Sequence, residues 1–119
     1  RYIKIPSNLA RAQKTIADEN IDMLIYLDIG MQVMSYMLAF ARLAPVQIAL
    51  HGHPATTGIP TIDYFFTSKH QEPEDAQRHY TEKLVAFERN YSIFQQRDIP
   101  QHRKTRAELG LPDGDVRLY

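Results

Sequence analysis

Cysteine is absent from this chain of 119 residues, and neither sign of charge is in excess, because 14 basic and 14 acidic side chains balance. The absence of cysteine excludes disulfide bonds and thiolate metal sites. It also fits a reducing compartment, so we predict a cytoplasmic location. A balanced charge does not favour a nucleic acid or an anionic membrane surface as a partner. We therefore expect a protein that does not act on polyanions.

Long apolar runs are missing as well. The longest apolar stretch, residues 31–44, is interrupted by Gln32, Ser35 and Arg42. It also falls short of the roughly 20 residues that a membrane-spanning helix needs. No charged-then-apolar leader starts the chain. We expect no membrane span.

The length corresponds to one domain or less, since single domains centre on roughly 100 to 150 residues. The chain starts at Arg1 without a methionine and stops at Tyr119, inside a segment that is predicted to be a strand. We therefore expect this sequence to be a piece of a longer protein.

Apolar segments separated by glycine and proline alternate between strand-like and helix-like patterns, which predicts an α/β fold. The near-continuous apolar run at residues 21–27 is typical of a strand covered on both faces, as in a parallel sheet. Ser7 is predicted to cap the first helix, and Pro45 is predicted to end the second. The predicted strands are residues 1–5, 21–27, 46–50, 62–67, 83–87 and 116–119; the predicted helices are 7–20, 32–43, 73–80 and 105–109, and an extended connector spans 89–104.

The loop that follows the predicted strand 46–50 is the main candidate for a binding site. In open α/β sheets, ligands bind in the crevice outside the carboxyl ends of the strands. Glycine at position 52 permits close backbone approach, and proline at 54 stiffens the turn, while hydroxyl groups and backbone amides follow as donors. The predicted substrate-binding residues are Gly52, His53, Pro54, Thr56, Thr57 and Gly58.

Two histidines in this loop, His51 and His53, invite a metal interpretation, because alternate residues of a strand lie on one face. Zinc sites, however, need three or four protein ligands, which are themselves oriented by hydrogen bonds from neighbouring groups. No cysteine is present, and the other histidines fall in unrelated predicted elements. We therefore predict no metal ion and interpret His53 as a polar residue of a cleft, with an ordinary packed histidine as the alternative.

Other polar and sulfur-containing residues have structural interpretations. Asp28 is predicted to cap the helix that opens near Met31, with a cleft carboxylate as the alternative. The acidic side chains of Glu72, Glu74 and Asp75 fit the start of a helix, where they face the positive end of its dipole. The methionines 31, 34 and 37 stand at helical spacing and are predicted to fill the core.

Five segments together carry a resemblance to a known family. They are DIGM at 28–31, ARLAPVQ at 41–47, HGHPATTGIPTIDYF at 51–65, EPEDAQRHYTEKLV at 72–85 and RAELGLP at 106–112. In this order they resemble the catalytic region of O-GlcNAc transferases, and most of all the bacterial family 41 glycosyltransferases. The string LAPVQ followed by GxPxTTG and IDY is far more specific than a single glycine motif.

The resemblance implies an enzyme of the GT-B type, in which two Rossmann-like halves face each other across a cleft. Residues 1–88 would then be the end of the first half, 89–104 a connector and 105–119 the start of the second half. The family transfers N-acetylglucosamine from UDP-GlcNAc to Ser or Thr hydroxyls of an acceptor protein, with inversion and without a metal. Many members carry tetratricopeptide repeats upstream.

The resemblance also places Gly52 and Pro54 close to the donor sugar and diphosphate. Relatives commonly have an apolar or aromatic residue where this chain has His51. The lysine and helix terminus that hold the diphosphate lie in the second half of the family's fold, so the catalytic residues stay unknown here, and we expect the piece alone to have little or no transferase activity. Two alternatives stay open: a protein O-fucosyltransferase that uses a GDP donor, and a non-catalytic binding or scaffold module with the GT-B fold.

Overall fold

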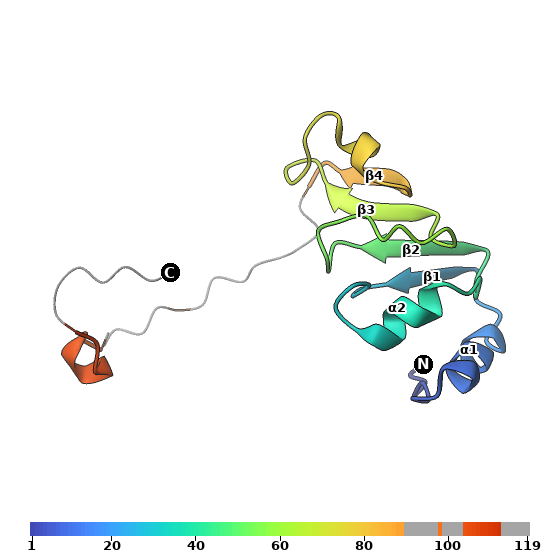
Figure 1. Ribbon diagram of the computed structural model, residues 1–119, viewed down its shortest axis with the longest axis horizontal. Helices are drawn as coiled ribbons and strands as arrows, with labels where there is room; N and C mark the ends of the chain where they lie inside the picture. The colour runs from blue at the N-terminus through green and yellow to red at the C-terminus, as the bar shows by residue number, and fades with distance from the viewer. Residues whose placement is uncertain (90–97, 99–103, 113–119) are drawn as a thin grey trace.

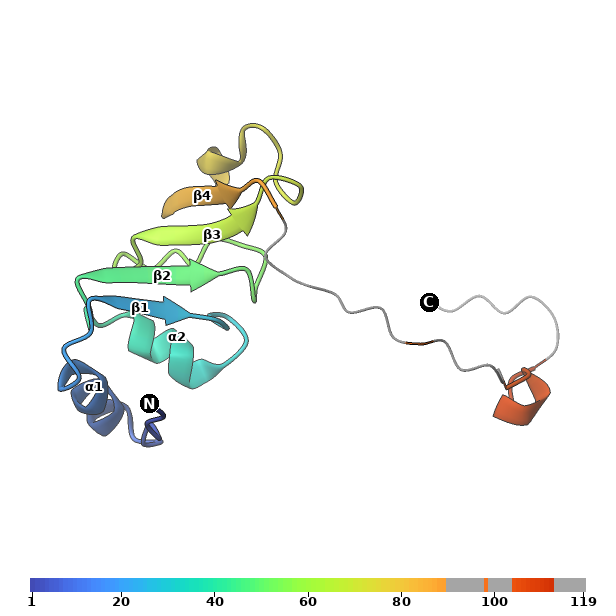
Figure 2. The same ribbon diagram turned by 180° about the vertical axis from the view of Figure 1, so that it is seen from behind.

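The computed structural model describes residues 1–89, 98 and 104–112 of the chain. Four strands form one sheet in the order β1-β2-β3-β4, and every neighbouring pair is parallel. Figure 1 shows the strands side by side, and Figure 2 shows their arrowheads on the same side. The predicted α/β class and the parallel sheet are confirmed. The elements are α1 (Leu9–Ala17), β1 (Met23–Tyr26), α2 (Val33–Ala39), β2 (Val46–Leu50), β3 (Tyr64–Ser68), η1 (Ala76–His79), β4 (Lys83–Phe87) and η2 (Ala107–Leu109).

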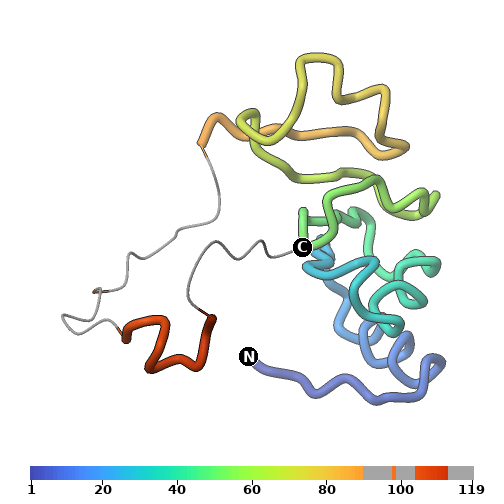
Figure 3. Tube along the Cα trace, turned by 60° about the vertical axis from the view of Figure 1, so that its left-hand side comes forward, coloured from blue at the N-terminus to red at the C-terminus, as the bar shows by residue number. Residues whose placement is uncertain are grey.

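The connections between the strands differ in kind. Helix α2 joins β1 to β2 and lies beside α1 (Figure 3), whereas β2 joins β3 through residues 51–63, which contain no helix. This extended crossover supplies two apolar side chains to the core, Ile59 and Ile62, which are 1% and 4% exposed. There they join Phe65 of β3 and Leu38 of α2 in one buried cluster. The burial of these apolar side chains therefore holds the crossover against the sheet, as a packed helix does for other connections.

A buried glutamine of β2 joins the turn that follows α2 to the end of the crossover. The Gln47 side chain is fully buried and donates hydrogen bonds to the carbonyls of Ala41 (3.1 Å) and Thr61 (2.9 Å). Its own carbonyl accepts from the backbone N–H of Leu43 at 3.0 Å. A buried polar group stabilises a fold only when its hydrogen bonds are satisfied, and here one side chain satisfies three backbone groups of two segments.

An ion pair closes the same region at the surface. The guanidinium of Arg42 donates to both carboxylate oxygens of Asp63, at 2.6 Å and 3.1 Å, and the backbone N–H of Gln47 donates to the same carboxylate at 2.8 Å. The hydrogen bond from Arg42 holds the pKa of Asp63 below its ordinary value, against the opposing effect of burial. Asp63 is thereby tied to Arg42, which precedes β2, and to Gln47 within β2.

One face of the sheet is left uncovered by the described residues. Right-handed crossovers that proceed in one direction all lie on the same face of a parallel sheet, so the opposite face receives no helix from these connections. The prediction that the run at 21–27 is covered on both faces is therefore wrong for the described part of the chain, where Met23, Ile25 and Leu27 are 52%, 44% and 64% exposed. This apolar face holds a shallow cavity of about 350 Å³ lined by Met23, Val46, Ile48, Tyr64, Phe66, Val85 and Phe87.

The helix starts also differ from the prediction. Residues 1–5 form no strand, and α1 is capped by Asn8, whose side-chain carbonyl accepts from the N–H of Arg11 at 3.1 Å. Ser7 and Asn8 are equally good capping types, so only the structure distinguishes them. The predicted helix 73–80 is a short 3₁₀ turn, η1.

The second predicted helix is shorter than expected. It ends at Ala39, well before Pro45, because the chain turns at Phe40 so that the carbonyl of Ala41 reaches Gln47. Met34 packs against the core as predicted, but Met31 and Met37 are 70% and 48% exposed, so they do not fill it.

The short helix near the end of the described chain, η2, lies within the predicted helix 105–109. The N–H of Glu108 donates to the Thr105 hydroxyl at 3.3 Å, and the N–H of Thr105 donates to the Glu108 carboxylate at 2.7 Å, a reciprocal capping box. Gly110 ends the turn at φ +66°, a conformation that favours glycine. The predicted connector lies mostly, and the strand at 116–119 entirely, outside the described residues.

Candidate functional site

The loops after β1 and β2 touch each other at the carboxyl edge of the sheet. A Cβ atom placed on Gly52 would lie 2.0 Å from the carbonyl oxygen of Leu27, closer than any non-bonded contact allows. Gly52 is therefore required by the backbone of the neighbouring loop. The close approach predicted at this glycine exists, and in the structure it is an approach to the protein's own chain.

His53 continues this contact. A Cβ on Gly30, which stands at φ +94°, would lie 3.1 Å from the His53 ring, so the imidazole rests over that glycine. His53 and Pro54 are both exposed at the edge of the sheet. A position at the mouth of a cleft is compatible with this exposure, and substrate contact by His53 stays a prediction.

The hydroxyl groups of Thr56 and Thr57 are turned inward, toward Glu82. Thr56 Oγ1 donates to Glu82 Oε2 at 2.7 Å, and the backbone N–H of Thr57 donates to Glu82 Oε1 at 2.7 Å. Thr57 Oγ1 also donates to Glu82 Oε1. Both hydroxyls, predicted as donors to a substrate, therefore hold a buried carboxylate, and the predicted contacts of Thr56, Thr57 and Gly58 with a ligand stay predictions.

Glu82 is 2% exposed, and its charge is stabilised by these hydrogen bonds. Burial alone raises the pKa of this carboxyl, but the hydrogen bonds from Thr57 and Thr56 outweigh that effect and hold the pKa below its ordinary 4.5. A carboxyl whose pKa is lowered by folding stabilises the folded state above its unfolded pKa, and this contribution is lost as the pH falls through the folded value.

We expect the stabilising effect of Glu82 to be acid-sensitive. At neutral pH the variant Glu82→Gln melts at a lower temperature than the wild type, and the gap narrows as the pH falls below 4.5, because the wild-type carboxyl then becomes protonated and loses its advantage. Thermal melts of both proteins from pH 7 downward, followed by circular dichroism, check this. A gap that stays constant over the range contradicts it.

A small cavity of about 190 Å³ opens beside Pro54, at the carboxyl ends of β2 and β3. Glu72 is its central acceptor: the same carboxylate oxygen accepts from Thr67 Oγ1 at 2.8 Å and from the Tyr80 hydroxyl at 2.9 Å. Burial and the neighbouring Glu72 raise the pKa of Tyr80 to about 12, so its hydroxyl keeps its proton. Burial lowers the pKa of His51, which also lines the cavity with Phe65 and Gln71.

Of the predicted site residues, only Pro54 lines this cavity, and the sequence interpretation missed the residues that form its wall, namely Thr67, Gln71, Glu72 and Tyr80. A signal was present. The segment after β3 ends at the same edge of the sheet as the loop after β2, because carboxyl ends of parallel strands converge. Glu72 was instead interpreted as a helix-start residue, and the helix it was meant to start does not form.

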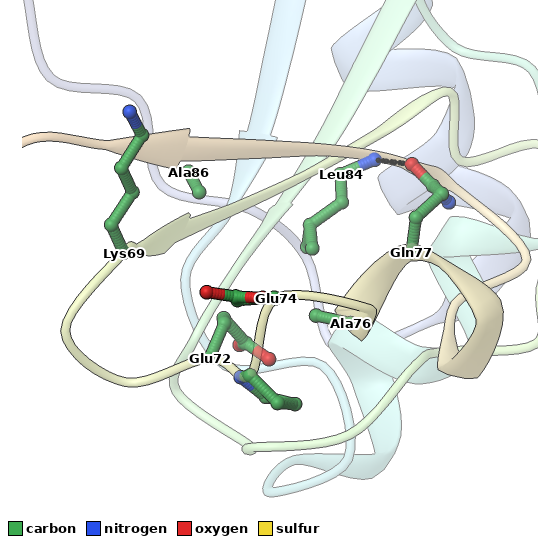
Figure 4. A pocket seen from close by; sticks show the side chains of 8 residues that line it. Lys69, Glu72, Glu74, Ala76, Gln77, Leu84 and Ala86 are labelled. Atoms are coloured by element: carbon green, nitrogen blue, oxygen red, sulfur yellow. Dashed lines mark hydrogen bonds between the residues drawn. The ribbon is translucent and has the colours of Figure 1, made fainter.

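A larger hollow of about 450 Å³ lies between η1 and β4 (Figure 4), and Glu72 lines both this hollow and the small cavity. Gln77 crosses its end, where its side-chain carbonyl accepts from the N–H of Leu84 at 2.9 Å. None of the predicted site residues lines this hollow.

The two histidines and Asp28 can be compared with their sequence interpretations. The His51 ring lines the small cavity, and the His53 ring rests over Gly30. Within the part of the chain that the structure describes, no three side chains of ligand type gather as they would around a metal ion. Asp28 does not cap α2: Gln32 stands at that position, and Asp28 contributes its backbone carbonyl to the N–H of Met31 at 2.9 Å.

The chain is 37% identical over 71 residues to the probable UDP-N-acetylglucosamine–peptide N-acetylglucosaminyltransferase SPINDLY of Arabidopsis thaliana, and 40% identical over 53 residues to SPINDLY of Solanum lycopersicum. These matches cover 59% and 44% of the chain, but 8% and 6% of the relatives. A mutant of the Thermobaculum terrenum O-GlcNAc transferase matches in structure with a TM-score of 0.63 and 33% identity, over 71% of this chain and 16% of that one.

A parallel α/β sheet with a glycine-dependent loop at its carboxyl edge defines a Rossmann-like unit of the kind found in GT-B glycosyltransferases. Residues 3–115 match the sequence model of glycosyl transferase family 41. The chain belongs to this family. No helix among the described residues is both long enough and apolar enough to span a membrane.

Proposed function

We propose that this chain is a segment of the catalytic region of a protein glycosyltransferase that moves N-acetylglucosamine from UDP-GlcNAc to Ser or Thr hydroxyls of an acceptor protein. Residues 1–88 would belong to the first Rossmann-like half, 89–104 to the connector and 105–119 to the second half. The names of the relatives support the donor and the peptide acceptor. The chain spans only 8% and 6% of the length of these relatives, which supports the proposal that it is a segment.

The observation that carries this proposal is the loop at the carboxyl edge. Gly52 is packed on the backbone of Leu27, and Thr56 and Thr57 are bonded to Glu82, so the exposed residues between them hold a defined shape. Catalysis of group transfer depends on such fixed geometry, because a reactant that is already oriented avoids much of the entropic cost of the reaction. In this proposal the loop contributes to the wall of the donor cleft, and the small cavity beside Pro54 is part of that wall.

Further features belong to the same proposal. The transfer proceeds with inversion and without a bound metal, and the diphosphate is held by residues of the second half. The parent protein acts in the cytoplasm and presents acceptors through tetratricopeptide repeats. The lack of cysteine supports a reducing compartment.

The test uses the full-length protein that contains this sequence. Purified protein is incubated with an acceptor peptide and either UDP-GlcNAc or GDP-fucose, in parallel reactions with and without EDTA. The mass of the peptide is then measured by mass spectrometry. We expect a mass increase of one N-acetylhexosamine with UDP-GlcNAc only, unchanged by EDTA. The 119-residue chain alone, as the matched control, is expected to modify nothing.

Each other outcome has a definite meaning. Transfer from GDP-fucose identifies a fucosyltransferase, and no transfer from either donor favours a scaffold module that kept the fold. Loss of activity in EDTA that added metal restores overturns metal independence. Turnover by the 119-residue chain alone contradicts the assignment of the diphosphate contacts to the second half.

A further inference from the structure

Glu82 is the one fully buried acidic side chain among the described residues, and it stands directly before β4, two strands away from the loop after β2. Within that part of the chain no cationic side chain forms an ion pair with it. A buried charge without a cation costs free energy unless hydrogen bonds satisfy it. Besides its own backbone N–H, the donors that satisfy the Glu82 carboxylate among the described residues come from Thr56 and Thr57.

The same hydroxyl groups organise their own loop. Thr56 Oγ1 accepts from the N–H of Gly58 at 3.3 Å and from the N–H of Thr81 at 3.1 Å, and Thr57 Oγ1 accepts from the N–H of Ile59 at 3.1 Å. Glu82 thereby sets the orientation of both hydroxyls. A hydroxyl has a single proton, so once it donates to the carboxylate it can only accept hydrogen bonds from backbone N–H groups.

The loop therefore has two fixed points. One is Gly52, held against Leu27 at the β1 side, and the other is the threonine pair, held by Glu82 at the β4 side. The residues between them, 53–55, are all exposed. No helix supports this segment, so its path depends on the two fixed points.

We propose that Glu82 is a positioning residue for the sugar-nucleotide site: through Thr56 and Thr57 it fixes the exposed segment 53–55 that faces the donor. The inference rests on the proposed function. Glu82 itself does not touch the donor, since its carboxylate is buried beneath the loop. Its removal lets the segment shift, and a misplacement of about 1 Å is enough to cost on the order of a hundredfold in rate.

The test compares variants of the full-length glycosyltransferase that contains this sequence, with UDP-GlcNAc as the varied donor. Glu82→Gln keeps the volume of the side chain but replaces one acceptor oxygen by a donor. We expect the donor KM to rise by about tenfold or more, while the KM for the acceptor peptide stays within about twofold. Ala12→Gly in helix α1 is the control, because it weakens a buried helix position without removing a hydrogen bond of Glu82, and it is expected to leave the donor KM unchanged.

A second variant keeps the test decisive if Glu82→Gln fails to fold. Thr57→Val preserves the shape of the side chain and removes the hydroxyl that Glu82 binds. It is expected to raise the donor KM in the same way, and the double variant is expected to be little worse than either single one, because both break one interaction. Hydrogen exchange of backbone amides supplies the structural readout: peptides covering 51–60 lose protection in the variants, and peptides of α1 lose it only in the control.

The failures are distinguishable. If the wild-type protein transfers sugar and both loop variants keep its donor KM, the positioning role is overturned and the proposed function stands. If the effects of the two substitutions simply add, the two residues act independently and the proposal is also wrong. If the wild type uses no sugar nucleotide, the proposed function fails, and the inference fails with it.

Discussion

Replacing Gly52 by alanine is expected to displace the loop at the carboxyl edge and to lower stability by about 3 kcal/mol, at the upper end of the cost of overpacking a filled site. The added methyl group would lie 2.0 Å from the carbonyl oxygen of Leu27 and 3.3 Å from Cα of Asp28. Both neighbours are backbone atoms, so no side-chain rotation relieves the clash. The thermal midpoint of the full-length protein, together with its donor KM, measures the effect.

Gly58→Ala is the matched control in the same loop. Gly58 stands at φ +65°, but a Cβ there has no atom within 4 Å, so alanine meets conformational strain without a clash. Such strain costs about 1 to 2 kcal/mol. The prediction therefore ranks Gly52→Ala clearly below Gly58→Ala in stability. Equal thermal midpoints for the two variants would show that space at position 52 is not the constraint.

Gln47→Leu is the second substitution with a large expected effect. Leucine is similar in size but leaves the carbonyls of Ala41 and Thr61 and the N–H of Leu43 without the partner that Gln47 gives them. Each buried polar group left unsatisfied costs about 1 to 3 kcal/mol, so the loss of three partners reduces stability by several times the effect of an ordinary substitution. Denaturation of the full-length protein followed by circular dichroism measures it.

The control for this substitution is Gln13→Leu. Gln13 lies half-buried in α1. Gln13→Leu makes the same change of side chain as Gln47→Leu, but at a position without a comparable set of hydrogen bonds. A change there is expected to stay within about 0.5 kcal/mol. Similar losses for Gln47→Leu and Gln13→Leu would contradict the role of Gln47 in joining the two segments.

The sequence predicted the strands best where proline, glycine or a charge ends an apolar run. Strands β2 and β4 have the predicted bounds, and the short helix η2 lies within the predicted range 105–109. The helix predicted at 73–80 failed because helix-start residues favour an N-terminus without ensuring a helix behind it. The sequence predicted a loop and no helix between β2 and β3, which is confirmed, but the path of this crossover comes from contacts distant in sequence.

The candidate site shows the same division. The loop and its glycine could be found from the sequence, because a glycine after a buried strand is a local signal. The partner of that glycine, Leu27, is 25 positions upstream, and the partner of Thr57, Glu82, is the same number downstream. No local pattern connects such residues. The sequence therefore predicted the two threonines as donors to a ligand, whereas in the fold their hydrogen bonds offset the free-energy cost of burying the Glu82 carboxylate.

Because the crossovers lie on one side of the sheet, its positions fall into two sets, one that packs against the crossovers and one that faces the uncovered side. Along each strand, alternate side chains point either to the layer that carries the loop and the cavities or to the uncovered face. Tyr26 and Phe65 belong to the first set, and Ile25 and Phe66 belong to the second. Substitutions at the exposed positions of the second set, such as Ile25, are therefore expected to leave the geometry of the carboxyl edge unchanged. In a deep mutational scan, tolerance to substitution should accordingly alternate with a period of two residues along β1, but not along β2, where Gln47, Ile48 and Ala49 are all buried.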